Sequence, residues 1–257
     1  MGQGGMSRFR PPLALRPSPM VAIPQAAFVL AAGLGKRMRP LTATRPKPLV
    51  EVAGRSLIDR ALDRIVAAGI GRAVVNVHYF ADALEAHLHS RKDVEIAVSD
   101  ERDCLLETGG GVNRALPLID ADPFYIVNSD NLWVDGPVDS FRLLAQRWDG
   151  AEMDALLLLV PLARANCHGG PGDFHMDPWG KLSRRRQNRV APFVFTGIQL
   201  VSRRLFDGAP DGAFSMNLLW DRAIAAGRCF GLVHQGLWFD VGTPPAVAHT
   251  GTALADG

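Results

Sequence analysis

The sequence predicts an α/β fold, in which a Rossmann-like open sheet, mixed but mostly parallel, is flanked by helices and carries a small antiparallel subregion. Three observations predict it. Short, almost wholly apolar runs are typical of strands that are buried on both faces of a parallel sheet. These runs alternate with segments of helical spacing, which is the rhythm of right-handed βαβ crossovers. A glycine-rich stretch that begins at residue 169 then predicts short antiparallel strands.

The first strand is expected at 26–32, where the sequence reads AAFVLAA. After a long loop, the next helix has Ser56 as its N-cap and Gly69 at its end, with apolar residues at helical spacing between them. The alternation continues with strands at 73–77, 94–98, 124–128 and 155–160 and helices at 80–88, 109–116 and 138–148. Ligands of such sheets bind beyond the carboxyl ends of the strands, so we expect the site there.

The segment 169–202 has a different texture, because short strand-like pieces are joined by turns such as PWGK at 178–181. We expect antiparallel strands here, folded over the site or onto the edge of the sheet, and assign about 165–205 to this subregion. Helical spacing returns at 215–227, and strand-like runs follow at 229–233 and 237–241.

The 257 residues, of which 47% are hydrophobic, suffice for one sizeable core, so residues 25–257 are expected to form a single domain. Residues 1–24 are rich in proline and arginine, contain no apolar run long enough for a signal peptide or a membrane span, and are predicted to be a disordered extension.

Charge and cysteine content limit the partners. The net charge of +2 arises from 28 basic and 26 acidic residues, which gives no support for a nucleic-acid or membrane partner. Three widely spaced cysteines without a CxxC pair argue against a disulfide framework and a zinc site, and favour a cytoplasmic location. Whether the protein is a monomer or a homodimer stays open.

The loop at 30–48, LAAGLGKRMRPLTATRPKP, comes close to two phosphate-binding motifs and completes neither. A dinucleotide fingerprint needs a third glycine where Met38 stands. A Walker loop needs Ser or Thr after Gly35 and Lys36, where Arg37 stands. Three prolines, Pro40, Pro46 and Pro48, exclude a continuous phosphate-capping helix, so the segment is predicted to be a long wrapped loop.

The residues of this loop nevertheless suit a polyphosphate. Gly33 and Gly35 let backbone amides approach an anion, Arg37 offers a planar fork for phosphate oxygens, and Lys47 offers a compact charge. The alternative is that these are solvated charges around a surface turn. The position of the loop after a buried strand favours a triphosphate or its departing pyrophosphate.

The extended motif LAAGLGKRMRPLTATRPKPLVEVAG at 30–54 closely resembles the signature of the sugar-1-phosphate nucleotidyltransferases. Later elements of that family are matched, in order, by LETGGGVNRALPLI at 106–119, FYIVNSDNLW at 124–133, FVFTGIQL at 193–200 and LWFDVGTPPAV at 237–247. Within the family, LETGGG and the compact length are most similar to bacterial N-acetylmuramate α-1-phosphate uridylyltransferases, which serve a cell-wall recycling route.

The resemblance implies a role for particular residues. The nucleotide would contact Ala31, Ala32, Gly33, Gly35, Glu107, Thr108 and Gly109. The sugar would face Asn128 and the main chain around Thr196 and Gly197. Arg37 and Lys47 would handle the phosphates, and Asp130 and Asp240 would hold Mg²⁺.

The implied reaction joins a nucleoside triphosphate, with UTP favoured, to a sugar 1-phosphate. A phosphate oxygen of the sugar 1-phosphate attacks the α-phosphorus in line, and pyrophosphate leaves. The nucleophile is already an anion, so no general base is needed, and the enzyme acts by positioning and charge stabilisation.

Several residues also have simpler interpretations. Asp130 and Asp240 are of a type that often caps helices or forms turns, and two histidines, His168 and His175, are more often surface residues than metal ligands without a neighbouring ligand pattern.

The sequence departs from the family pattern before residue 193. Many relatives carry a Glu-Lys-Pro triplet there, whose Lys grips the sugar phosphate, whereas this chain reads RRRQNRVAP. Lys181 or one of Arg184, Arg185, Arg186 and Arg189 is a candidate for that role. These arginines form either a solvated face or a site for the lactyl carboxylate of N-acetylmuramate.

Three other functions remain open from the sequence. A mannose- or heptose-1-phosphate guanylyltransferase would share the loop. A non-catalytic nucleotide-sugar sensor would be expected to have lost Arg37, Lys47, Asp130 or Asp240, all of which are present. A dinucleotide-dependent oxidoreductase is disfavoured by Met38.

Overall fold

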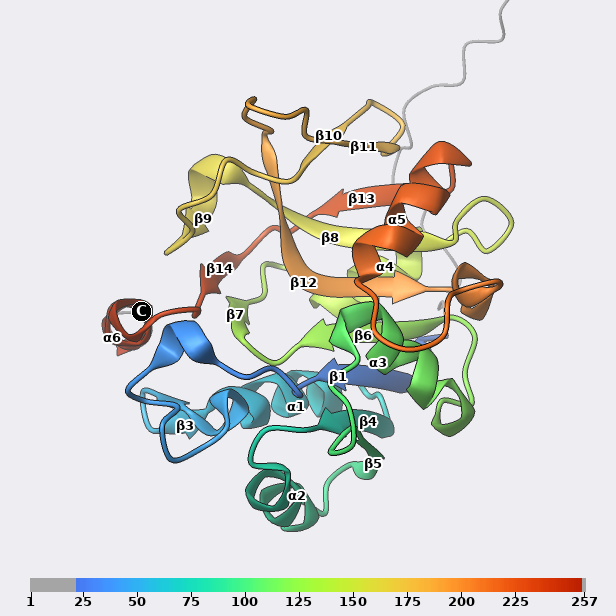
Figure 1. Cartoon of the computed structure of the whole chain (residues 1–257). Helices are drawn as coiled ribbons and strands as arrows, with labels where there is room; N and C mark the ends of the chain where they lie inside the picture. Colours follow the sequence, from blue (N-terminus) through green and yellow to red (C-terminus); the bar gives the residue numbers. More distant parts are fainter. Residues whose placement is uncertain (1–21, 256–257) are drawn as a thin grey trace, which may run out of the picture.

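The computed structural model describes residues 22–255 (Figure 1). Residues 1–21 of the predicted N-terminal extension lie outside the described residues, as do residues 256–257. Within the described part, no helix is long and apolar enough to cross a membrane.

A nine-stranded mixed sheet forms the centre of the fold, in the order β11-β10-β12-β6-β1-β4-β5, with β8 paired to β12 and β13 paired to β8. Its strands are β1 (Ala26–Leu30), β4 (Arg72–Val77), β5 (Glu95–Asp100), β6 (Phe124–Asn128), β8 (Ala155–Pro161), β10 (Phe174–Met176), β11 (Leu182–Arg184), β12 (Phe193–Val201) and β13 (Cys229–Val233). Strands β6, β1, β4 and β5 are parallel, and β12 runs antiparallel to both β6 and β8. The predicted Rossmann-like mixed sheet is confirmed.

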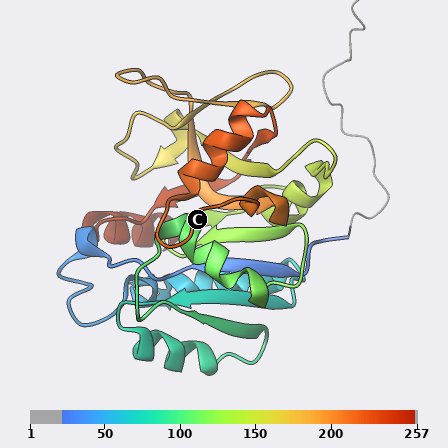
Figure 2. The ribbon, with the colours of Figure 1, turned by 45° about the vertical axis from the view of Figure 1, so that its right-hand side comes forward.

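Helices cover both faces of this sheet, as Figure 1 and the turned view in Figure 2 show. They are α1 (Leu57–Ala67), α2 (Ala81–His89), α3 (Glu107–Ala115), α4 (Ser140–Arg147) and α5 (Met216–Ala225). Helix α6 (Pro244–Ala255) packs mainly against short strands outside this sheet. Alternate residues of β1 enter two separate cores: Ala27 and Val29 pack with α1, α2 and α4, while Ala26 and Phe28 pack with α3 and α5. This explains why the strand is apolar at every position, since both of its faces are buried.

Helix α1 begins as the sequence predicts. The Ser56 hydroxyl accepts a hydrogen bond from the Asp59 N–H at 3.1 Å, which satisfies one of the free amides of the first turn. Gly69 follows the helix with a φ of 85°, a conformation that glycine adopts without steric cost.

The antiparallel subregion contains a short hairpin, β10–β11, at the edge of the sheet, and its turn at 177–181 is the one that PWGK predicts. Strand β12, which lies in the same part of the sequence, is an inner strand between β6 and β8. Its burial explains this place: Val194, Ile198 and Leu200 are all buried.

The loop after β1 contains two single 3-10 turns, Lys36–Met38 and Lys47–Leu49, and no α-helix, as its prolines predict. Met38 is fully buried in a small core with Val50, Leu57 and Phe239. The residue that replaces the third glycine of a dinucleotide motif therefore anchors this loop to the body of the protein.

A second sheet of three short strands lies beside the first, in the order β7-β14-β9: β7 (Asn131–Val134), β14 (Leu237–Asp240) and β9 (Ala165–Asn166). Strands β2 (Glu51–Val52) and β3 (Arg55–Ser56) form a separate pair before α1. The antiparallel register of β7 and β14 places Asp240 opposite Asn131, directly beside Asp130 in the chain.

Candidate active site

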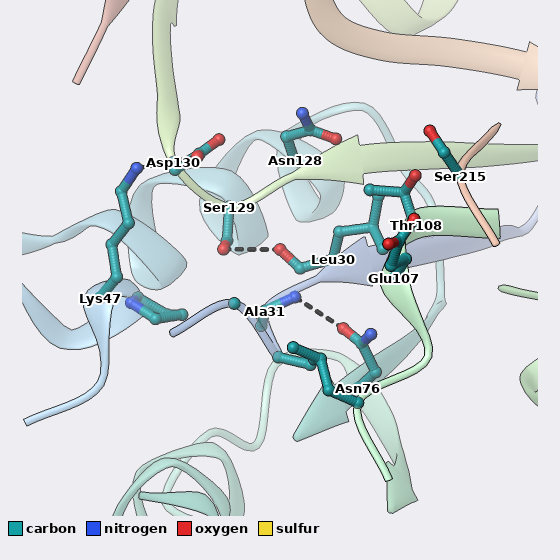
Figure 3. A pocket seen from close by; sticks show the side chains of 14 residues that line it. Leu30, Ala31, Lys47, Asn76, Glu107, Thr108, Asn128, Ser129, Asp130 and Ser215 are labelled. Atoms are coloured by element: carbon teal, nitrogen blue, oxygen red, sulfur yellow. Dashed lines mark hydrogen bonds and ion pairs between the residues drawn. The ribbon is translucent and has the colours of Figure 1, made fainter. Parts of the chain in front are cut away.

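A pocket of about 370 Å³ opens at the carboxyl ends of β1 and β6 (Figure 3). Leu30 and Asn128, the last residues of the two strands, both line it. Its other lining residues that the sequence had singled out are Ala31, Ala32, Gly33, Lys47, Glu107, Thr108 and Asp130. These residues thus meet at the edge of the sheet where parallel α/β folds bind ligands.

A buried chain of hydrogen bonds holds the turn after β1. The Ala31 N–H donates to Asn76 Oδ1 at 2.6 Å, and Asn76 Nδ2 donates to Glu101 Oε1 at 2.7 Å (Figure 3 shows the first of these). The second oxygen of Glu101 accepts from the Leu106 N–H at 3.1 Å. One fully buried carboxylate thereby connects the turn at Ala31 to the segment that leads into α3.

Burial raises the pKa of Glu101, against the opposing effect of the hydrogen bonds from Asn76 and Leu106. Sequence reasoning missed both Asn76 and Glu101. The available signal was an amide side chain inside the otherwise apolar run AVVNV, which needs a buried partner.

The glycines at 109–111 serve packing. The Gly109 N–H donates to the Phe214 carbonyl at 2.8 Å, and a Cβ on Gly109 would lie 2.4 Å from the Phe214 ring. Gly109 therefore does not line the pocket beside Glu107 and Thr108, although the sequence predicts that all three lie along the base. Helix α3 also begins at Glu107, two residues before the predicted start at Gly109.

Lys47 and Asp130 form an ion pair at one end of this pocket, where Lys47 Nζ lies 2.8 Å from Asp130 Oδ2. Lys47 is buried, with 8% of its surface exposed. Gly35 does not line the pocket but supports this arrangement, because a Cβ there would lie 3.0 Å from Thr42 Cγ2 and 3.1 Å from Lys47 Cβ, and its φ of 59° is left-handed.

A second pocket of about 240 Å³ adjoins the first and shares Asn128 and Asp130 with it. Its other lining residues are Arg37, Asn131, His168, Asp173, Phe174, Arg184, Val194, Phe195, Asn217, Trp220, Trp238 and Asp240. The two pockets are therefore connected through the segment that follows β6.

Asp130 and Asp240 both line the second pocket, although 110 positions separate them in the sequence. The pairing of β7 with β14 brings them together. Gly242 leaves room for Arg37 beside Asp240, since a Cβ there would lie 2.9 Å from Asp240 Oδ1 and 3.5 Å from Arg37 Nη2.

His168 belongs to this pocket, against the sequence interpretation that places it on the surface. Its Nδ1 lies 3.5 Å from Asp240 Oδ2, and its buried Nε2 has no hydrogen-bond partner among residues 22–255. The glycines around His168 explain the error, because in a sequence they indicate an exposed turn. In the structure, β9 precedes His168 and pairs with β14, which places the turn beside Asp240. His175 is exposed, as expected.

Thr196 and Gly197 lie behind the wall of the second pocket. Thr196 is fully buried, its hydroxyl donates to the Leu158 carbonyl, and its own carbonyl accepts from Trp238 Nε1 at 2.8 Å. A Cβ on Gly197 would lie 2.2 Å from Asn131 Nδ2, so this glycine lets Asn131 pack closely. Neither residue lines the two pockets, and Asn128 alone of the predicted sugar contacts does so.

The donor set around Asp130 and Asp240 is compatible with a hard divalent cation. Two carboxylates supply oxygen ligands in a pocket open to further ligands, which suits Mg²⁺ with water and phosphate oxygens completing its shell. Within residues 22–255, no cluster of three or more His, Cys, Asp or Glu side chains could hold a metal ion by itself.

Comparison with known proteins identifies the family. Residues 26–169 match the family model of nucleotidyl transferases. The chain is 42% identical to N-acetylmuramate alpha-1-phosphate uridylyltransferase of Caulobacter vibrioides, over 92% of this chain and 100% of that protein. It is 35% identical to the protein of the same name from Neisseria meningitidis serogroup B, over 84% of this chain and 93% of that protein.

Solved structures share the fold at lower identity. HddC from Yersinia pseudotuberculosis superposes with a TM-score of 0.73 at 20% identity, covering 90% of this chain and 99% of its own. The inositol-1-phosphate CTP transferase from T. maritima gives a TM-score of 0.74 at 17% identity, covering 92% and 98%. The family match and the full-length relatives together show that this chain belongs to the nucleotidyl transferase family and is a nucleotidyltransferase.

Proposed function

We propose that the protein transfers the uridylyl group of UTP to N-acetylmuramate α-1-phosphate, which gives UDP-N-acetylmuramate and pyrophosphate. Two relatives that align over most of this chain carry the corresponding name. The observation that carries the proposal is the pair of connected pockets, which share Asn128 and Asp130 and have Lys47 at one side of their junction. Such an arrangement suits a reaction that joins two phosphate-bearing substrates.

The larger pocket is the proposed site of the nucleotide. Backbone groups of Ala31 to Gly33 line it on one side, and Glu107 and Thr108 line it on another. The hydrogen bond from the Ala31 N–H to Asn76 holds the turn in one conformation before the nucleotide arrives. A preformed turn loses less conformational entropy on binding.

The second pocket is the proposed site of the sugar 1-phosphate. Its aromatic residues Phe174, Trp220 and Trp238 suit the apolar faces of a sugar ring, while Asn128, Asn131 and Asn217 offer amides for its hydroxyl and acetamido groups. The 1-phosphate would lie toward Asp130, where the two pockets meet.

The reaction needs no general base. An oxygen of the sugar 1-phosphate forms a new bond to the α-phosphorus, and the bond between that phosphorus and the bridging oxygen of the pyrophosphate breaks. Lys47 and Arg37 supply positive charge for the α-phosphate and for the leaving pyrophosphate, so positioning and charge neutralisation lower the barrier. Asp130 and Asp240 would hold Mg²⁺, which when bound neutralises phosphate charge and orients the leaving group.

The test is pyrophosphate release in the presence of Mg²⁺, with ATP, CTP, GTP and UTP each paired with N-acetylmuramate, N-acetylglucosamine, glucose and mannose 1-phosphates. We expect the highest kcat/KM for UTP with N-acetylmuramate α-1-phosphate. A preference for GTP with mannose 1-phosphate would keep the reaction class and reject the proposed substrates.

A further inference from the structure

We infer that Arg184 is the residue that recognises the lactyl carboxylate of the sugar. This inference rests on the proposed function, because N-acetylmuramate differs from N-acetylglucosamine by a lactyl ether that carries one negative charge. A sugar site that selects the first compound needs a cation for that carboxylate, at a distance from the cations that handle the phosphates.

Among the four arginines at 184–189, the structure distinguishes Arg184 from the others. Arg184 lines the second pocket. Arg185 donates to the carbonyls of Gly172, Arg186 and Arg189 and so braces its own loop. Arg186 and Arg189 are exposed and line neither pocket.

The described basic side chains that line the second pocket are Arg37, His168 and Arg184. Arg37 and His168 both lie next to Asp240, at the part of the pocket assigned above to phosphate and metal. Arg184 contacts a different set of lining residues, Phe174, Trp220 and Asn217. It is therefore the cation available to a second anionic group on the sugar.

The guanidinium of Arg184 is held in place on the pocket wall. It lies 4.9 Å from the centre of the Phe174 ring and 5.5 Å from that of Trp220. Trp220 is itself fixed, since its Nε1 donates to Gln199 Oε1 at 2.8 Å. Stacking on two aromatic rings restricts the guanidinium without using its N–H donors.

The hydrogen bonds of Arg184 leave one donor group free. Nε donates to Asp221 Oδ1 at 2.6 Å, and Nη2 donates to the carbonyl and the side-chain oxygen of Asn217 at 3.1 and 3.0 Å. Nη1 has no protein acceptor among residues 22–255. The side chain of Asp221 is 58% exposed, so water screens this ion pair and leaves Arg184 able to attract a second carboxylate.

The experiment compares N-acetylmuramate α-1-phosphate with its lactamide, which has the same bulk without the charge, and with N-acetylglucosamine 1-phosphate. kcat/KM is measured with UTP and Mg²⁺ for the wild type and for Arg184→Gln. We expect the acid-to-amide ratio of kcat/KM to fall roughly ten- to a hundredfold in the variant, through KM for the acid, as the loss of a charge-assisted hydrogen bond predicts. kcat/KM for N-acetylglucosamine 1-phosphate, which makes no such bond, should fall by a smaller factor than kcat/KM for the acid.

Two controls separate charge recognition from structure. Arg186→Gln removes an exposed arginine of the same run and should leave the ratio unchanged. Asp221→Asn loosens the tie of Arg184 to α5 while keeping the cation, and should keep or increase the preference for the acid. If Asp221→Asn lowers the ratio as much as Arg184→Gln does, Arg184 acts through structure and the inference is wrong.

The remaining outcomes are also decisive. An unchanged ratio in Arg184→Gln would overturn the inference while the proposed function stands. Wild-type enzyme that fails to use the acid with UTP would overturn the proposed function itself. Should Arg184→Gln not fold, Arg184→Lys carries the test, because it keeps the charge but not the planar fork, and the ratio should still fall by roughly threefold or more.

Discussion

At the scale of single residues, the site depends on charged and polar side chains that hydrogen bonds and ion pairs hold in fixed positions. Lys47 is buried against Asp130, and the Ala31 turn is held through Asn76 by the buried Glu101. The loop motif predicts Lys47, since loops of this kind bind phosphates, and the family resemblance implied Asp130. It does not predict Asn76 and Glu101, because their role depends on a contact between segments 25 residues apart, which no local pattern reports.

Replacement of Lys47 tests its charge. We expect Lys47→Met to lower kcat by about a hundredfold or more. This is the usual effect of removing one group that stabilises the negative charge developing in the transition state. Single-turnover measurement of UDP-sugar formation would follow the chemical step directly. Lys36→Met is the matched control, because Lys36 is exposed and lines neither pocket, and its rate should stay within about twofold of wild type. A Lys47→Met variant with wild-type kcat and an altered base preference would refute the phosphate role.

At the scale of elements, the three glycines of α3 show how packing can imitate a binding motif. The sequence predicts the helix and the proximity of its first turn to the ligand, and Glu107 and Thr108 do line the larger pocket. The glycines instead let α3 pack against the segment before α5: a Cβ on Gly110 would lie 2.2 Å from the Gly212 carbonyl oxygen. This contact could not be predicted, because it involves a loop about a hundred residues later in the chain.

Gly110→Ala should therefore destabilise the protein. Two backbone segments would have to separate, so we expect the free energy of unfolding to fall by about 1–3 kcal/mol, the usual cost of overpacking. Gly251→Ala in α6 is the matched control, since its Cβ would lie 3.8 Å from the nearest atom and alanine favours helices by up to about 1 kcal/mol. Urea denaturation of both variants measures the difference. Equal stability of the two would show that α3 can move away from the Gly212 loop.

At the scale of the whole molecule, strand pairing assembles what the sequence keeps apart. The alternation of strands and helices predicts the parallel half of the sheet, because each βαβ unit is local. The inner position of β12, between β6 and β8, and the small β7-β14-β9 sheet were not predicted, since pairing between strands that are distant in the sequence leaves no periodic signal. That small sheet nevertheless completes the site, because the pairing of β7 with β14 brings Asp240 into the same pocket as Asp130. Only the family resemblance had implied that these two residues lie close together.

The proposed metal site can be tested through the stability of the whole protein. We expect UTP with Mg²⁺ to bind the folded state alone, so at about 100 times Kd it should add about 2.7 kcal/mol of stability, which corresponds to a rise in Tm of roughly 5–10 °C for a chain of this size. Asp240 lines the second pocket and not the larger one, so Asp240→Asn should keep the rise that UTP gives in EDTA and lose the further rise that Mg²⁺ adds in the wild type.

Asp173→Asn is the control for this measurement, because Asp173 lines the same pocket and its Oδ2 accepts the Phe195 N–H at 2.9 Å, a bond that an asparagine oxygen can also accept. It should respond to Mg²⁺ as the wild type does. A response of Asp240→Asn equal to that of the wild type would place the metal elsewhere, and the β7–β14 pairing would then serve only to close the pocket. Loss of the Mg²⁺ response in Asp240→Asn alone would instead mean that Asp240, the last residue of β14, holds the ion, so that the metal binds only after β14 has paired with β7.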